Sequence, residues 1–349
     1  MFDWKLLLRS SGADAVILTS PSNTLYASGY VSSFRTALLT KDGGYFLTDS
    51  RYFGEASEKV KGLKVVECSN QSLYSTLIEL LQGAKRVAYD TDISLVEYLE
   101  LTAKLASFEL VPLGKELSLM RSVKSDMEIE KIRKALSISE KAFDMLLGFV
   151  REGVSERECA YTLEYYMMKL GGERISFDTI MAFGENTAYP HAHPTDKRLE
   201  KGMFVTCDFG AVVDGYHSDI TRTFVFGKPT DKMLDVYNTV KDAGSLAMEN
   251  IKDGVSARYV DSVAREHISK KGYGEYFTHS LGHGVGIDIH EEPRLASSSD
   301  TVLVTNNVVT VEPGIYIGGE FGVRIEEMVV VKDDGNERLN VSTRELIML

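Results

Sequence analysis

The chain has 349 residues, which is long enough for two domains with ordinary hydrophobic cores. With 44% apolar and 26% charged residues, it has the composition of a globular protein and not of a disordered one. The net charge of −12 argues against nucleic acid as a partner, because phosphate binding requires a basic surface, and it suits a protein that binds cations.

The sequence predicts a cytoplasmic protein without membrane spans. The N-terminal stretch MFDWKLLLRSSGADAV has an early aspartate and only a short apolar run, unlike a signal peptide. No apolar run approaches the roughly 20 residues of a membrane-spanning helix. Cys68, Cys159 and Cys207 are far apart and odd in number, which predicts free thiols in a reducing compartment.

The first third of the chain predicts an α/β domain over residues 1–122, because short apolar strands alternate with helical segments. An apolar strand at 15–19 ends at a Ser-Pro-Ser-Asn turn, and strands at 37–40 and 45–48 flank a Lys-Asp-Gly-Gly hairpin turn. Further strands are expected near 65–66 and 87–89, with helices near 55–60, 71–82 and 94–105. No cluster of catalytic residue types occurs in this third.

Residues 123–349 form the second predicted domain, and their sequence repeats at an offset of 101 residues. The stretch VREGVS at 150–155 returns as IKDGVS at 251–256, and apolar positions match on both sides. Each copy predicts two helices followed by strands. Ser125 and Asp126 offer an N-cap for the first helix, which stops at Gly153, and a Ser155–Glu158 capping box opens the second. We expect two similar α+β halves about a pseudo-two-fold axis, with a site between them.

Residues 203–226, MFVTCDFGAVVDGYHSDITRTFVF, predict two strands joined by a turn at Val213 and Asp214. Folding the segment there sets Asp208 opposite Asp219, and cross-strand neighbours have Cβ atoms about 5 Å apart. Facing carboxylates on apolar strands repel, so they need a counter-charge, which one or two divalent cations would supply. In the alternative interpretation both side chains point to solvent, and this stretch alone does not decide between the two.

A second pair of carboxylates follows near the C-terminus. Glu312 ends an apolar strand, and Glu326 follows 14 residues later across Gly318-Gly319, so an irregular hairpin sets them opposite one another. Strand alternation places Arg324 and Glu326 on one face and Glu327 on the other, which favours Glu326 as the inward carboxylate. Between the two pairs, THSLGHGVG places His283 among glycines, which allow close backbone approach.

Taken together, these motifs resemble the pita-bread metallopeptidases, which include methionine aminopeptidase, aminopeptidase P and prolidase. The motifs are D-x-G, followed by a second aspartate in S-D-I-T-R-T, and then G-H-G-V-G, V-E-P-G and R-I-E. The first third is similar to the N-terminal domain of the creatinase and prolidase branch through L-T-S-P-S-N and T-D-S-R-Y-F. Methionine aminopeptidases lack that domain. The resemblance implies an α+β fold: an N-terminal α/β creatinase-like domain and a C-terminal pita-bread domain with an internal pseudo-two-fold duplication.

The resemblance also implies a binuclear metal site. Its five ligands would be Asp208, Asp219, His283, Glu312 and Glu326. Asp208 would bind one ion bidentately, His283 and Glu312 would bind the other, and Asp219 and Glu326 would bridge both. A metal-bridging hydroxide would attack the peptide, and Glu312 would pass its proton to the leaving proline nitrogen. One histidine with four carboxylates favours Mn²⁺ over Zn²⁺, and Co²⁺ often supports activity in this family.

Further site residues carried over by the resemblance surround these ligands. His191, His279 and His290 would have substrate-binding or catalytic roles. Arg324 would form hydrogen bonds with the carboxylates, and Tyr316 would line the site. His193 and His217 lie beside the motifs and are left out of the predicted site. The branch further implies a homodimer.

The implied function is metal-dependent hydrolysis of Xaa-Pro bonds, with proline at the second position of a peptide. Two activities remain open: a prolidase must recognise the free carboxylate of a dipeptide, whereas aminopeptidase P must leave room for a longer chain. Two other classes are a catalytically inactive binding protein on the same fold and a non-peptidase metallohydrolase.

Overall fold

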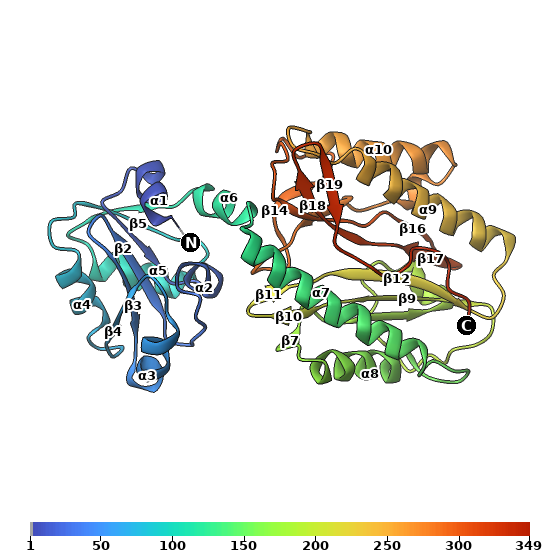
Figure 1. Ribbon diagram of the computed structural model, residues 1–349, viewed down its shortest axis with the longest axis horizontal. Coiled ribbons are helices and arrows are strands. Elements are labelled where there is room, and N and C mark those ends of the chain that lie inside the picture. The colour runs from blue at the N-terminus through green and yellow to red at the C-terminus, as the bar shows by residue number, and fades with distance from the viewer. Residues whose placement is uncertain (1–2) are drawn as a thin grey trace. The chain divides into compact units, whose positions relative to one another are not determined.

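The computed structural model describes residues 3–349, which divide into two compact units, one ending at Arg121 and one running from Ser122 to Leu349 (Figure 1). Each unit has its own core. No helix in the described residues is both long enough and apolar enough to cross a membrane.

The first unit is a six-stranded mixed sheet with helices, in the strand order β4-β3-β2-β1-β5-β6. Its strands are β1 (Ala15–Leu18), β2 (Thr36–Thr40), β3 (Gly44–Thr48), β4 (Lys64–Glu67), β5 (Arg86–Tyr89) and β6 (Glu109–Pro112). Its helices are α1 (Trp4–Ser11), α2 (Pro21–Ser28), α3 (Ser50–Lys59), α4 (Leu73–Leu80) and α5 (Leu95–Lys104). Both faces are buried, because Val16 and Leu18 of β1 enter one apolar cluster while Ala15 and Ile17 enter another.

The predicted β2–β3 hairpin is confirmed, with Leu39 paired to Gly44, and so are the strands near 65–66 and 87–89 and the three predicted helices. Sequence reasoning missed α1, α2 and β6, as well as α6 (Glu116–Ser122). These are short elements of four to eight residues, in which periodicity gives little signal.

The second unit contains two helix pairs that confirm the predicted duplication. They are α7 (Asp126–Leu147) with α8 (Glu156–Lys169), and α9 (Asp231–Glu249) with α10 (Ala257–Lys270). The bounds of α8 and α10 are 101 residues apart at both ends. Gly153 and Gly254 before them share a left-handed φ, of 82° and 78°. The first helix stops at Leu147 with Gly148 as its cap, so the predicted extension to Gly153 is wrong.

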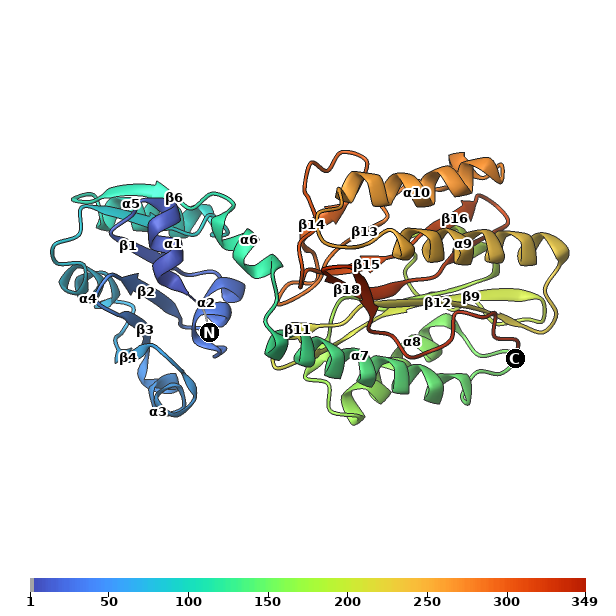
Figure 2. The same cartoon turned by 45° about the horizontal axis from the view of Figure 1, so that its top comes forward.

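The strands of the second unit lie between the two helix pairs, with α7 and α8 on one side and α9 and α10 on the other (Figures 1 and 2). The first half holds β7 (Arg174–Ile175), β8 (Ile180–Phe183), β9 (Met203–Phe209), β10 (Ala211–Val213), β11 (Tyr216–His217) and β12 (Ile220–Phe226). The second holds β13 (Gly282–Gly284), β14 (Glu291–Leu295), β15 (Val308–Val311), β16 (Gly314–Ile317), β17 (Phe321–Arg324), β18 (Glu327–Lys332) and β19 (Gly335–Arg338). One apolar cluster joins α9 and α10 to strands of both halves.

The predicted register of the aspartate hairpin is wrong by two residues. β9 pairs with β12 so that Asp208 lies opposite Thr221, not Asp219. The turn is formed by Asp214 and Gly215, whose φ values of 49° and 77° are both left-handed, as in the two-residue turns that suit hairpins. The hairpin also breaks at Gly210, where a Cβ would lie 1.9 Å from the Ser218 carbonyl oxygen.

The glutamate hairpin has the register predicted for it. β15 and β18 pair Val311 with Glu327, and β16 and β17 pair Gly314 with Arg324. The register is the same on both sides of the break between these strand pairs, so Glu312 and Glu326 lie opposite one another. Glu327 points to the other face, where it is buried and forms an ion pair of 2.9 Å with Arg222.

Candidate metal centre

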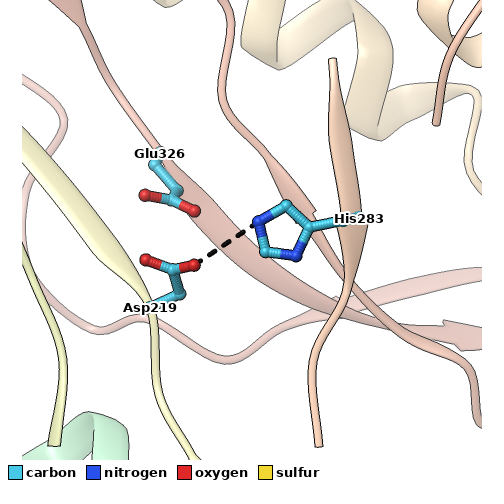
Figure 3. Close-up of side chains that lie close together, drawn as sticks. All are labelled: Asp219, His283 and Glu326. Carbon is cyan, nitrogen blue, oxygen red and sulfur yellow. Dashed lines mark ion pairs between the residues drawn. The ribbon is translucent and has the colours of Figure 1, made fainter. Parts of the chain in front are cut away.

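Three side chains from distant parts of the second unit converge on one point. Asp219 lies just before β12, His283 is in the middle of β13, and Glu326 lies between β17 and β18. One potential ligand atom from each lies within 4.8 Å of the others. Figure 3 shows the three side chains pointing toward one another, with His283 Nε2 3.5 Å from Asp219 Oδ2. The same nitrogen lies 3.4 Å from Glu312 Oε1.

The glycines beside His283 allow its strand to fit between its neighbours. A Cβ at Gly282 would lie 2.0 Å from the Thr310 carbonyl oxygen, and one at Gly284 would lie 2.2 Å from the Glu292 carbonyl oxygen. The His283 Nδ1 lies 3.1 Å from the Gly284 carbonyl oxygen. That contact favours a proton on Nδ1, which leaves the Nε2 lone pair facing the carboxylates.

Arg324 connects the carboxylates of the two hairpins. Its Nη2 donates to Asp208 Oδ2 at 2.7 Å, and its Nε donates to Thr221 Oγ1 at 3.0 Å. The Thr221 hydroxyl in turn donates to Glu326 Oε2 at 2.9 Å. A guanidinium suits this position because its planar set of donors reaches several acceptors at once.

The remaining carboxylate oxygens fit a cation. Asp208 Oδ1 and Glu326 Oε1 are buried and have no hydrogen-bond partner within residues 3–349. A buried, unpaired carboxylate oxygen is costly, and a cation bound to these two atoms would remove that cost. The donor set is one imidazole nitrogen with carboxylate oxygens, which divalent ions of the Mn²⁺ type prefer.

The pKa values of the clustered side chains also indicate a cation site. Burial, and then the neighbouring carboxylates, raise the pKa of Asp219 and of Glu326 well above the ordinary value. Burial raises the pKa of Glu312 to about 8. Burial, together with the nearby His290, lowers the pKa of His283 to about 4. Arg324 offsets only part of the negative charge of these carboxylates, and divalent metal ions would supply the remaining counter-charge.

A cavity of about 450 Å³ opens onto this cluster. The predicted residues that line it are Asp208, Asp219, His283, Glu312, Glu326, His191, His279, His290 and Arg324. Tyr316 is not among the lining residues; it lies behind them, and its hydroxyl is 2.9 Å from His279 Nε2 and accepts from Arg324 Nη1 at 2.8 Å. His193, which is not part of the predicted site, also lines the cavity, whereas His217 is buried outside it.

Arg294 is a charged residue of the cavity that the sequence did not predict. Arg294 projects from β14 into the cavity, and it is exposed. Within residues 3–349 its side chain forms no hydrogen bond and no ion pair, unlike Arg324, which is bonded to Asp208. Its sequence context, Glu-Glu-Pro-Arg-Leu, gave no signal, because an arginine on a short strand is usually a solvated surface residue.

Comparison with known proteins finds Xaa-Pro peptidases that are similar to this chain over nearly its whole length. An Xaa-Pro dipeptidase of Pyrococcus horikoshii is 38% identical over 341 residues, covering 96% of this chain and 94% of the relative. The structure of an X-Pro aminopeptidase from Thermotoga maritima superposes with a TM-score of 0.93 at 38% identity, covering 98% of this chain and all of that one (100%). The structure of an Xaa-Pro dipeptidase from Bacillus anthracis gives 0.94 at 39% identity, covering 99% and 98%.

Models of two protein families match successive parts of the chain. Residues 5–123 match the creatinase/prolidase N-terminal domain, and residues 130–333 match metallopeptidase family M24. The two-unit architecture with a duplicated catalytic unit is therefore the expected one. The chain belongs to metallopeptidase family M24 and is a metallo-exopeptidase with a creatinase/prolidase N-terminal domain.

Proposed function

We propose that this chain is an Xaa-Pro dipeptidase whose substrate is held by its free carboxylate at Arg294. The observation that carries the choice is the unpaired guanidinium of Arg294 in the wall of the cavity. A cation at that position would form a charge-assisted hydrogen bond with the C-terminus of a dipeptide. Relatives named as dipeptidases support this activity, while the Thermotoga maritima relative is named as an aminopeptidase, so resemblance alone does not decide.

The proposed site holds two divalent ions, with Mn²⁺ favoured by the oxygen-rich donor set. Asp208, Asp219, His283, Glu312 and Glu326 would hold them. When bound, such ions polarise a carbonyl group and make water a nucleophile near neutral pH.

The proposed proton carrier is Glu312. Its Oε1 accepts a hydrogen bond from Thr310 Oγ1 at 3.2 Å, and burial raises its pKa to about 8 in the metal-free chain. Bound cations would lower that pKa, and a carboxylate that lines the cavity can accept a proton there and donate it again. The leaving proline nitrogen is a tertiary amide nitrogen without an N–H, so it must be protonated as the bond breaks.

The histidines provide neutral hydrogen-bonding groups around the substrate. Burial lowers the pKa of His279 to about 4, and burial also lowers the pKa of His290. The His279 ring lies between the Tyr316 hydroxyl and the Ser280 carbonyl oxygen, at 2.9 Å and 2.8 Å, so its orientation is fixed. His191 and His290 are more exposed to the cavity, and we assign them to substrate binding.

Substitution of Arg294 tests the proposed specificity. In Arg294→Met, the KM for Ala-Pro should rise by about tenfold to a hundredfold, because a hydrogen bond to a charged group contributes about 1.5–3 kcal/mol. Hydrolysis of Ala-Pro amide, which has no carboxylate, should be slow and unchanged by the substitution. Bound metal should also be unchanged. Equal hydrolysis of Ala-Pro by both proteins would contradict the assignment.

A further inference from the structure

Glu156 is a fully buried carboxylate at the start of α8, outside the cavity. Its Oε1 accepts from Phe183 N at 2.7 Å and from Asn186 Nδ2 at 2.9 Å. Its Oε2 accepts from the backbone nitrogen and the hydroxyl of Thr195, at 2.8 Å and 2.5 Å. All of these donors are neutral, and all lie at the two ends of one segment, residues 183–195.

That segment carries His191 into the cavity. Its middle is fixed by two further contacts: the Pro190 carbonyl oxygen accepts from Arg324 Nη1 at 3.1 Å, and Thr187 Oγ1 accepts from Gly322 N at 2.8 Å. Glu156 therefore closes the segment into a loop whose far side bears the histidine. Burying a carboxylate without a cation is costly, and here the cost is offset only while the loop keeps its shape.

The other half of the catalytic unit has a corresponding arrangement. Asp261 of α10 is fully buried, and its Oδ1 accepts from Leu281 N at 3.0 Å. Both of its oxygens also accept from Arg265, each at 2.9 Å. Arg265 in turn donates to the carbonyl oxygens of Phe277 and His279, at 3.0 Å and 2.9 Å. The segment that carries His279 is thus held by a buried carboxylate as well.

The two carboxylates are not copies of one ancestral residue. At the repeat offset of 101, Glu156 corresponds to Ala257 and Asp261 corresponds to Ala160, and both alanines are buried. Each half therefore has an acidic residue where the other has alanine, yet both acidic residues bind the chain segment that brings a histidine to the cavity. A contribution to helix packing alone does not account for this shared connection.

We propose that Glu156 and Asp261 are positioning residues, one in each half, that act on hydrolysis through His191 and His279 respectively. The proposal rests on the proposed function for its effect on turnover. Under this proposal, the second helix of each half fixes the position of one cavity histidine, His191 or His279. This role is separate from that of the residues that would bind the metal ions.

Glu156→Gln tests the first half. Glutamine keeps the volume, but its amide group faces two donors and loses two of the four hydrogen bonds. We expect kcat/KM for Ala-Pro to fall by about tenfold to a hundredfold, since misplacing a group by about 1 Å can cost as much. Binding of Mn²⁺, measured by calorimetry, should be unchanged. Glu158→Gln is the matched control, because Glu158 is on the same helix but bonds to Ser155 and Arg198 instead.

Double-mutant cycles separate positioning from a general loss of stability. In a His191→Ala background, Glu156→Gln should have no further effect on kcat/KM, whereas in a His279→Ala background it should keep its full effect. Asp261→Asn should show the opposite pattern. Equal effects of Glu156→Gln in all backgrounds would overturn the proposal and leave a structural role only.

A measurement without turnover keeps this proposal distinct from the proposed function. Hydrogen exchange of Mn²⁺-treated protein should rise in residues 183–195 of Glu156→Gln and in residues 277–281 of Asp261→Asn, each without change in the other segment. If the wild-type protein fails to cleave Ala-Pro, the proposed function fails, while local exchange still decides whether the carboxylates hold these segments. Unchanged exchange in both variants would overturn the proposal.

Discussion

Removing metal should make the protein sensitive to rising pH. Without a cation, burial raises the pKa of Glu312 from 4.5 to about 8, and it raises the pKa of Asp219 and Glu326 as well. In the unfolded chain these groups ionise near pH 4–4.5, so above that pH the folded state binds more protons. Stability therefore falls as pH rises toward the folded pKa.

The window from pH 6.5 to pH 8 isolates this effect. His279 and His283 have folded pKa values of about 4, below the unfolded value of 6.5, so they reduce stability only below pH 6.5. One carboxyl that stays protonated costs about 1.4 kcal/mol per pH unit, which is roughly 2 kcal/mol across the window. For a unit of this size, that corresponds to a fall in Tm of about 4–8 °C.

Thermal unfolding of metal-stripped and Mn²⁺-loaded protein, at pH 6.5 and pH 8, measures this fall. The stripped protein should melt lower at pH 8, while the loaded protein should change little, because bound cations keep the carboxylates ionised in both conditions. In metal-stripped Glu312→Gln, the difference in Tm between pH 6.5 and pH 8 should be smaller, since one of the titrating groups is gone. A stripped protein that is equally or more stable at pH 8 would refute the reasoning.

Three further predictions concern the ligands, Arg324 and the association state. Asp219→Ala and Glu326→Ala should each abolish bound Mn²⁺ and turnover, and near-normal metal content by elemental analysis in either would contradict the ligand assignment. Arg324→Lys should lower kcat by roughly tenfold or more, because lysine cannot reproduce the guanidinium geometry; an unchanged kcat would show that the geometry is unimportant. If the predicted homodimer forms through the apolar face of α5, where Leu95 and Leu99 are 70% and 56% exposed, Leu95→Glu/Leu99→Glu should make it monomeric; light scattering that shows an unchanged dimer would exclude that face.

The metal cluster illustrates what could be predicted from sequence. Glu312 and Glu326 were predicted to be opposite one another because their hairpin keeps a single register, and alternation distinguished Glu326 from Glu327. The register of the aspartate hairpin is predicted wrongly, because the prediction centres the turn on Val213 and Asp214. The Asp-Gly pair one residue later is the stronger signal for a turn with two left-handed residues, and it would have given the observed register.

Other features could not be predicted because they depend on packing between distant segments. Arg294 is unpaired only because of where β14 lies, and no local pattern indicates that. Glu156 occupies the first turn of a helix, where an acidic residue is common for its interaction with the helix dipole alone. Its role appears only when residues 183–195 are folded against it. Cross-strand and loop contacts of this kind require the tertiary structure.

Hydrolysis of Ala-Pro and Ala-Pro-Ala by the Mn²⁺-loaded protein tests the proposed function most directly. Cleavage of the dipeptide, with little or no cleavage of the tripeptide, is the predicted result. Cleavage of the tripeptide at its first bond would instead make the enzyme an aminopeptidase P. Cleavage of neither peptide, with bound metal confirmed, would contradict the proposal that this site hydrolyses Xaa-Pro bonds.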